Sequence, residues 1–251
     1  MRRRRCLSIW WLAKSGRDRF YGRGVTATFS LRCVMPVAVT PLPQTVEIVA
    51  VDDTFLVVNK PSGLLSVPGR GPDKADCLSA RVQAEFPGAL VVHRLDMETS
   101  GLMVFARNLD AQRALNRAFE QRLVQKYYVA MVTGIVENDQ GTIDLPLICD
   151  WPNRPRQMVD HAIGKPSTTH YVVLARDEKL KQTRIGLTPI TGRSHQLRVH
   201  MASLGHAIIG DSLYSVNPPP EGQRLLLHAA KLSFPHPVSA EPVNCVSDVP
   251  F

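Results

Sequence analysis

Asp96 lies in the most chemically distinctive stretch of this chain, the polar run His93–Gly101. It follows Arg94 by two residues and precedes a Thr-Ser-Gly turn that leads into the apolar run Leu102–Ala106. Catalytic groups often stand on tight loops of this kind, where a buried strand holds the loop in place. An aspartate alone in such a turn most often accepts backbone N–H groups. Its chemistry therefore depends on the side chains that accompany it.

An aromatic pair, Tyr127 and Tyr128, begins a predicted strand over Tyr127–Thr133 that ends at Gly134. Taken alone, two aromatic side chains on a strand are expected to pack in the core. They bear on chemistry only if the fold brings one of them to the Asp96 loop.

A third polar run, Thr191–His200, overlaps a predicted helix over Ser194–Leu204, with Gly205 as its stop signal. Its two histidines, His195 and His200, are five residues apart. That spacing lacks the i,i+4 register of the HExxH zinc motif, so no metal site is expected here.

The formal net charge of +8 comes from the first 34 residues, which hold nine Lys/Arg and one acidic residue. The other 217 residues balance 21 basic against 21 acidic side chains. The basic pI therefore says nothing about the folded part. We expect a folded domain over 35–251 and a basic extension over 1–34 that is disordered or reflects an early start codon, with Met35 as the natural start. An organellar transit peptide is the alternative interpretation of this arginine-rich extension.

The five cysteines are scattered and never spaced as CxxC, which favours a reducing cytoplasm over disulfides or a zinc site. No stretch approaches the roughly 20 apolar residues of a membrane span. We therefore expect a cytoplasmic protein with neither a membrane nor a metal as partner.

Predicted strands outnumber predicted helices and often follow one another directly, which favours an α+β fold with a mixed, mostly antiparallel sheet flanked by helices and loops. Two helices are expected besides the one before Gly205: Cys77–Phe86, and a second one capped by Asn108 or Asp110 that runs to about Arg122. The other expected elements are a hairpin of Val46–Val51 and Phe55–Asn59, strands over Leu102–Ala106, Thr168–Ala175, Thr183–Pro189 and Leu225–Phe234, and an irregular segment over Asp144–Arg156.

The run His93-Arg94-Leu95-Asp96-x-x-Thr99-Ser100-Gly101-Leu102 resembles the catalytic motif of the RluA-type pseudouridine synthases at every defining position. Lys126–Gly134 fits the family pattern K-x-Y-x-A-x-V-x-G, and Gly192–His200 fits G-R-x-H-Q-L-R-x-H. Ala207 stands where the family usually has proline. Further matches are the opening K-P-x-G motif in Asn59–Gly69, the closing strand at Arg224–Ala229, and Asp144–Pro155, which is similar to the branch that contains RluA itself, a dual-specificity rRNA and tRNA enzyme without an S4 domain.

This resemblance implies the pseudouridine synthase fold and a role for each matching residue. Asp96 would be the nucleophile, Tyr128 would stack on the target base, and Arg198 would form an ion pair with the nucleophile. Arg94 would fill the gap left when the uridine flips out of its stack. The further substrate-binding residues that the resemblance implies are His93, Thr99, Arg193 and Leu226.

The implied activity is the isomerisation of specific uridines in a large-subunit rRNA loop and a tRNA anticodon stem-loop, by a monomer that needs no cofactor. The carboxylate can add to C6, attack C1′ or assist elimination to a glycal. Phosphates are expected to meet arginines near the loops: Arg70, Arg94, Arg107, Arg154, Arg156 and Arg193.

Two alternatives compete with this interpretation. A glycosidase would use Asp96 and Glu98 as its two carboxylates, but residues two apart on one loop are poorly placed to flank a bond from opposite sides. A non-catalytic RNA-binding module on the same fold is expected to have lost the carboxylate, which is present here.

Overall fold

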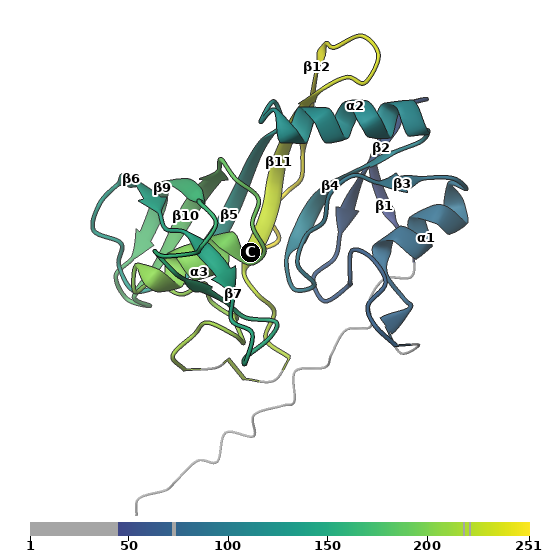
Figure 1. The fold of residues 1–251 in the computed structure, drawn as a ribbon. Helices are drawn as coiled ribbons and strands as arrows, with labels where there is room; N and C mark the ends of the chain where they lie inside the picture. Colours follow the sequence, from purple (N-terminus) through teal and green to yellow (C-terminus); the bar gives the residue numbers. More distant parts are fainter. Residues whose placement is uncertain (1–44, 72–73, 218, 221) are drawn as a thin grey trace, which may run out of the picture. The chain divides into compact units, whose positions relative to one another are not determined.

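The computed structural model describes residues 45–71, 74–217, 219–220 and 222–251. The expectations for the extension over 1–34 and for a start at Met35 lie outside these ranges. The described elements (Figure 1) are β1 (Glu47–Val51), β2 (Phe55–Lys60), α1 (Leu78–Glu85), β3 (Leu90–Val91), β4 (Ser100–Ala106), α2 (Leu109–Glu120), β5 (Gln125–Thr133), β6 (Gln140–Asp144), β7 (Leu147–Cys149), β8 (Gln157–Val159), β9 (Thr168–Asp177), β10 (Gln182–Pro189), α3 (Gln196–Ser203), β11 (Leu227–Pro235) and β12 (Pro242–Val246).

Ten of the described strands form one sheet, whose main path runs β1-β2-β4-β11-β5-β10-β9-β6. β3 pairs with β4 and β12 pairs with β11 beside this path. β4 and β11 run parallel, and the other described pairs of this sheet are antiparallel. The predicted α+β class with a mixed, mostly antiparallel sheet is therefore confirmed.

β4 is buried along its whole length because both of its faces are covered. Leu102 and Val104 pack in a cluster with Leu115 of α2, whereas Met103 and Phe105 pack in a different cluster that includes apolar residues of α1. Successive strand residues point to opposite faces, so a strand covered on both sides appears in the sequence as a continuous apolar run. This strand carries the Asp96 loop at its amino end.

Gly101 lies where β4 and β11 come together, paired with Ala229. Its φ is +112°, and a Cβ atom at this position would lie 2.4 Å from the Ala229 carbonyl oxygen. Only glycine has neither the backbone restriction nor the clash. The glycine of the Thr-Ser-Gly turn therefore fixes where the Asp96 loop joins the sheet.

α3 packs through Leu197 and Met201 against apolar residues of β5 and β10, such as Ile185. The helix follows His195, which has a left-handed φ of +53°, and it is succeeded by Gly205 at +84°. The expected helix in this region is confirmed, with a later start. The left-handed backbone at His195 turns the chain into the helix in the middle of the polar run Thr191–His200.

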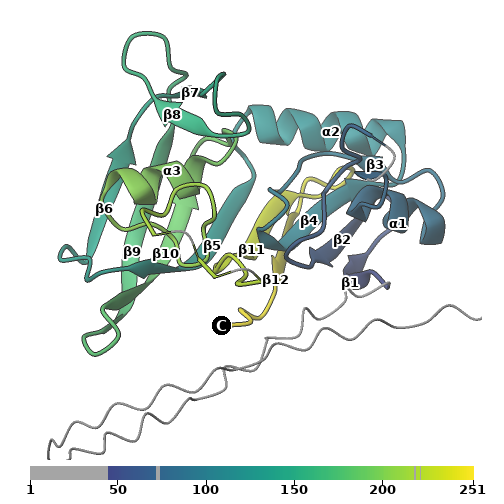
Figure 2. The same cartoon turned by 90° about the horizontal axis from the view of Figure 1, so that it is seen from below.

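The other expected helices and the first hairpin are also confirmed, and Asn108 caps α2 by accepting the N–H of Ala111 at 2.8 Å. The segment Asp144–Arg156, expected to be irregular, contains β7, which pairs with β8 in a separate two-stranded sheet beside α3 (Figure 2). Strands of three residues between prolines carry too little periodicity to be seen in the sequence. Within the described ranges, no helix has the length and apolarity to cross a membrane.

Candidate active site

A cavity of about 320 Å³ brings together residues of the polar runs His93–Gly101 and Thr191–His200 and one of the two tyrosines of the aromatic pair. The Asp96 loop forms one wall, Tyr128 of β5 another, and the beginning of α3 a third. Of the residues proposed from the sequence, the cavity is lined by His93, Arg94, Asp96, Thr99, Tyr128, Arg193 and Arg198.

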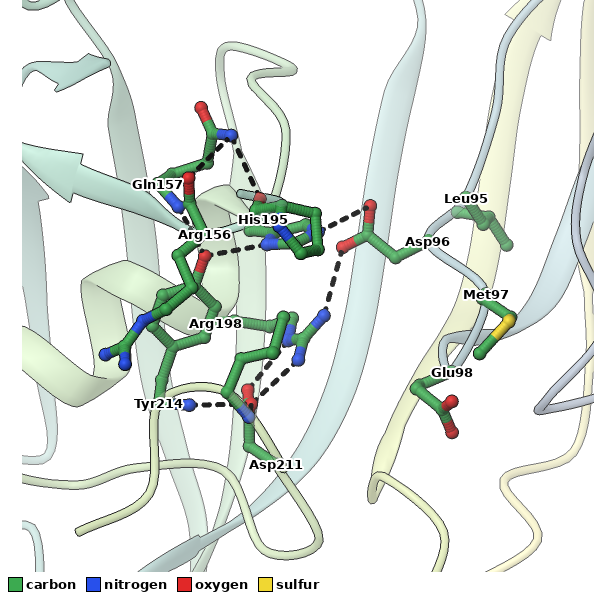
Figure 3. Close-up of polar contacts among 12 residues, drawn as sticks. Leu95, Asp96, Met97, Glu98, Arg156, Gln157, His195, Arg198, Asp211 and Tyr214 are labelled. Carbon is green, nitrogen blue, oxygen red and sulfur yellow. Dashed lines mark hydrogen bonds and ion pairs between the residues drawn. The ribbon is translucent and has the colours of Figure 1, made fainter. Parts of the chain in front are cut away.

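The Asp96 carboxylate stands between two nitrogen donors (Figure 3). Arg198 Nη1 lies 4.0 Å from one carboxylate oxygen, and His195 Nε2 lies 4.0 Å from the other. These distances exceed those of hydrogen bonds, so the attraction is electrostatic and leaves both oxygens open toward the cavity. The Asp96 side chain is 21% exposed, so solvent screens this attraction only partly. Its backbone carbonyl closes the turn by accepting the Thr99 N–H at 3.1 Å.

Arg198 has a closer partner than Asp96. Its Nε and Nη2 each donate to one oxygen of Asp211 at 2.7 Å, and both side chains are buried. Burial opposes the charge on Arg198, but the hydrogen bonds and the negative charge of Asp211, with a contribution from Asp96, leave the pKa of Arg198 raised. The expected pairing of Arg198 with Asp96 is therefore present, but at 4.0 Å it is longer than the 2.7 Å contacts between Arg198 and Asp211. Asp211 fixes the guanidinium, and the remaining Nη1 faces Asp96.

His195 is held by Tyr214, another residue to which the sequence assigned no role. The His195 Nδ1 atom lies 2.7 Å from the Tyr214 hydroxyl, which also accepts the Gln157 backbone N–H at 2.7 Å. Burial lowers the pKa of His195, against the raising effect of Asp96. The carboxylate facing Nε2 favours a neutral ring with its proton on that nitrogen, leaving Nδ1 to accept the Tyr214 proton. The imidazole then presents an N–H to Asp96.

The two tyrosines of β5 point to opposite faces of the sheet, because successive residues of a strand alternate between its faces. Tyr128 lines the Asp96 cavity, and Tyr127 lines a different cavity together with residues of β11 and β12. Burial, followed by the negative charge of Asp96, raises the pKa of Tyr128. The Tyr128 hydroxyl therefore keeps its proton at neutral pH, and its ring forms a neutral apolar wall beside the carboxylate.

Two of the proposed substrate-binding residues are held by the protein itself. His93 Nε2 accepts the Val104 N–H at 3.1 Å, and its ring packs on Phe119 with centroids 4.8 Å apart. Burial, with a smaller effect of Lys126, lowers the pKa of His93 to about 3, so the ring is neutral. Thr99 is buried in the turn. His93 and Thr99 thus fix the loop, whereas Arg94 and Arg193 lie exposed at its rim.

Leu226 is not placed as expected. It lines another cavity together with Arg184 and Phe251, and its neighbour Leu227 lines the Asp96 cavity. Adjacent residues of an extended chain face opposite sides, so an error of one position exchanges the two faces. The apolar wall residue of the closing strand is therefore Leu227 in place of Leu226.

Lys60 holds the Asp96 loop in place through hydrogen bonds to backbone carbonyls. The K-P-x-G motif did not reveal this role. The side chain is completely buried, and Nζ donates to the carbonyls of Pro61, Leu64 and Met97 at 2.9, 2.7 and 2.8 Å. All three ammonium protons are thus used. Burial lowers the pKa of Lys60 to about 7, although the charges of Glu98 and Asp96 oppose the shift. The bond to Met97 ties the residue after Asp96 to the end of β2.

The depressed pKa makes stability depend on pH. In the unfolded chain Lys60 keeps its proton up to about pH 10.5, whereas in the folded protein it releases it from about pH 7. Between these values the unfolded state binds more protons, so the contribution of Lys60 to the free energy of unfolding rises with pH, by at most about 1.4 kcal/mol per unit. Urea unfolding of the wild type and Lys60→Met at several pH values measures it. The difference between the two proteins is expected to change with pH; a constant difference would contradict the assignment.

Comparison with known proteins decides the family. The family model described as RNA pseudouridylate synthase matches residues 54–203. The dual-specificity RNA pseudouridine synthase RluA of Vibrio vulnificus (strain CMCP6) is 55% identical over 203 residues, which cover 79% of this chain and 81% of the relative. The chain belongs to the RNA pseudouridylate synthase family.

Other relatives agree with this assignment. RluA of Escherichia coli (strain K12) is 52% identical over 192 residues, covering 74% of this chain and 85% of that protein. The solved structure of human RNA pseudouridylate synthase domain containing 1 matches with a TM-score of 0.69 and 31% identity, over 86% of this chain and 87% of that one. This pseudouridine synthase is of the RluA type, as the sequence motifs indicated, and its substrate is RNA.

The glycosidase alternative lacks its second carboxylate. Glu98 does not line the cavity, and Figure 3 shows its side chain directed away from Asp96. Among the described residues that line the cavity, Asp96 is the only acidic one. A pseudouridine synthase needs a single carboxylate there, so the site's composition suits that reaction.

Proposed function

We propose that this enzyme converts uridine to pseudouridine in both a large-subunit rRNA loop and a tRNA anticodon stem-loop, with Asp96 as the nucleophile. The proposal rests above all on Asp96, the only acidic residue among the described residues that line a cavity otherwise formed by apolar, aromatic, cationic and neutral polar side chains. Support for two substrates comes from the relatives named dual-specificity RNA pseudouridine synthase and from the similarity of Asp144–Pro155 to that branch.

The reaction rearranges bonds without adding or removing atoms overall. The N1–C1′ bond breaks, the uracil rotates, and a C5–C1′ bond forms; the C5 proton leaves to water and N1 gains one. Asp96 would add to C6, attack C1′ or assist elimination to a glycal. Arg198 and His195 flank the carboxylate, because each presents a nitrogen atom 4.0 Å from one of its two oxygens.

Access to the base requires that the uridine leave its stack, which costs a few kcal/mol. Arg94 is exposed at the rim of the cavity, where its side chain can occupy the vacated position and contact the displaced backbone. The Tyr128 ring on the cavity wall provides a stacking surface for the flipped base. These two residues would therefore supply the binding energy that offsets the cost of flipping.

Replacing the Tyr128 ring tests that role. Tyr128→Leu is expected to weaken binding of a substrate stem-loop about 5- to 150-fold, because stacking of a base on an aromatic ring contributes about 1–3 kcal/mol. Tyr128→Phe keeps the ring and is the matched control, expected to bind RNA like the wild type. Filter binding or anisotropy titration measures both. Equal affinity of the leucine variant and the wild type would rule out stacking.

Dual specificity is tested with RNA isolated from a strain that lacks the gene. The purified enzyme is incubated separately with large-subunit rRNA and with total tRNA, and pseudouridines are mapped by carbodiimide-dependent reverse-transcription stops. One new site is expected in the rRNA, and one in the anticodon stem-loop of some tRNAs. Modification of only one RNA class would overturn the claim of dual specificity while leaving the family activity untouched.

We propose further that the enzyme acts as a monomer in the cytoplasm. The three residues assigned to catalysis, Asp96, Tyr128 and Arg198, all line this one cavity, and the described cysteines, Cys77, Cys149 and Cys245, are unpaired thiols. Light scattering at the concentration of the assay checks the first claim, and fractionation of cells checks the second.

A further inference from the structure

The strands β7 and β8 form a hairpin that stands off the ten-stranded sheet, and we call residues 147–159 the hairpin arm. Its tip, residues 150–156, is held by the protein's own backbone. The Asp150 N–H donates to the Arg156 carbonyl at 3.0 Å, and the Asn153 N–H donates to the Asp150 carbonyl at 3.1 Å. The tip therefore has a defined shape on which side chains can be presented.

Trp151 is displayed at this tip with 64% of its surface exposed. The guanidinium of Arg154 lies 4.5 Å from the centre of its ring. An indole is a large apolar surface, and leaving it in water forgoes the burial that normally stabilises it. A rigid tip that holds an exposed indole beside a cation has the features of a binding surface.

The charge of the tip is positive. The Asp150 carboxylate accepts the Asn153 side-chain amide at 3.1 and 3.0 Å. None of the ion pairs within the described ranges involves Arg154 or Arg156. An exposed indole with the Arg154 guanidinium over it, and a second arginine at the end of the same tip, match the two parts of a nucleotide, a planar base and a phosphate.

The arm is joined through Tyr214 to His195 on the wall of the Asp96 cavity. The guanidinium of Arg156 lies 5.5 Å from the centre of the Tyr214 ring, and the Gln157 N–H donates to the Tyr214 hydroxyl. Tyr214 in turn contacts His195, which faces Asp96 (Figure 3). A uridine in the cavity therefore lies beside His195, two contacts away from the Gln157 end of the arm.

We propose that the hairpin arm binds an unpaired nucleotide of the substrate RNA that flanks the target uridine, with the base stacked on Trp151 and the phosphates paired with Arg154 and Arg156. This rests on the proposed function, because it takes the RNA stem-loop as the ligand. The two cations of the tip, Arg154 beside the indole and Arg156 next to Tyr214, favour a polyanion over the apolar face of another protein. The arm thus selects among RNA loops by the presence of a stackable base beside the target.

Substitutions at Trp151 give the kinetic test on a substrate stem-loop. Trp151→Ala is expected to lower kcat/KM about 5- to 150-fold, chiefly through a higher KM. Trp151→Phe keeps an aromatic face and is expected to recover most of that loss. Leu180→Ala, on the β9–β10 turn and similarly exposed at 65%, is the matched control and should behave as the wild type. Wild-type KM in Trp151→Ala would overturn the proposal.

Fluorescence separates failure of this inference from failure of the proposed function. The chain has three tryptophans, so Trp10→Phe/Trp11→Phe leaves Trp151 as the single emitter. Titration of this variant with the stem-loop is expected to quench the Trp151 fluorescence. When Arg154→Gln is introduced into the same variant, we expect weaker RNA binding and a smaller dependence of the affinity on salt concentration. Quenching by an RNA that is not isomerised would reject the proposed function alone. Isomerisation without quenching would reject the proposal that the arm binds RNA. The same conclusion would follow if Trp151→Ala changed only the self-association of the protein, measured by light scattering, and left RNA binding unchanged.

Discussion

Asp96→Asn is expected to abolish pseudouridine formation, with a loss of at least about 1,000-fold in the rate of tritium release from RNA carrying uridine tritiated at C5. The amide has nearly the size of the carboxylate but carries no charge and is no nucleophile. Arg198 and His195 lie 4.0 Å away and form no hydrogen bond with Asp96, so the substitution leaves their own contacts with Asp211 and Tyr214 intact. The loss should therefore be one of chemistry rather than of folding.

The neighbouring carboxylate provides the matched control for this variant. Glu98 lies on the same loop but does not line the cavity, so Glu98→Gln removes the same charge without touching the reacting atoms. It is expected to retain activity within a few-fold of the wild type. Full activity of Asp96→Asn, or an equal loss in both variants, would end the nucleophile assignment. Thermal unfolding of each protein shows whether a loss of activity follows from a loss of structure.

Asp211→Ala is expected to destabilise the folded protein by about 3–5 kcal/mol, because it leaves the buried Arg198 guanidinium without its bidentate partner. The same variant should lose activity, since nothing then orients the Nη1 group toward Asp96. Urea unfolding measures the first effect and tritium release the second. The double variant Asp211→Ala/Arg198→Met removes the unpaired charge as well and is expected to recover part of the stability but none of the activity.

An exposed ion pair serves as the comparison for this effect. Arg176 Nη2 lies 2.7 Å from Asp139 Oδ1, the same distance as in the Arg198–Asp211 pair, yet the Asp139 side chain is 84% exposed. Asp139→Ala is therefore expected to cost about 1 kcal/mol or less. If Asp211→Ala were equally mild, the bridge from Asp211 through Arg198 to Asp96 would not be a structural support of the site.

The sequence predicted the parts of the fold that have local signatures. The apolar run of β4, the caps of α2 and the glycine after α3 each depend on neighbouring residues, and all three are found in the structure. The short strands β3, β6, β7, β8 and β12 were missed because their pairing partners, and not their own periodicity, define them. The exchange of Leu226 for Leu227 has a related cause, since motif matching does not fix which face of a strand a residue occupies.

The sequence predicted only the site residues that belong to recognisable motifs. Asp96, Tyr128 and Arg198 come from three motifs and do line one cavity. The supporting contacts of Asp211, Tyr214 and Lys60 depend on side chains brought together by the tertiary fold, over separations of up to 57 residues between Gln157 and Tyr214. The roles of Asp211 and Tyr214 became visible only with their distances to Arg198 and His195.

The central claim is that Asp96 performs uridine isomerisation in cellular RNA, and complementation tests it most directly. A strain that lacks the gene is supplied with the wild type or with Asp96→Asn at matched protein levels, and pseudouridines are mapped in its total RNA. The wild type is expected to restore the missing pseudouridines and Asp96→Asn to restore none. Restoration by Asp96→Asn would contradict the nucleophile assignment, and sites unchanged by deletion of the gene would point instead to an RNA-binding module without catalysis.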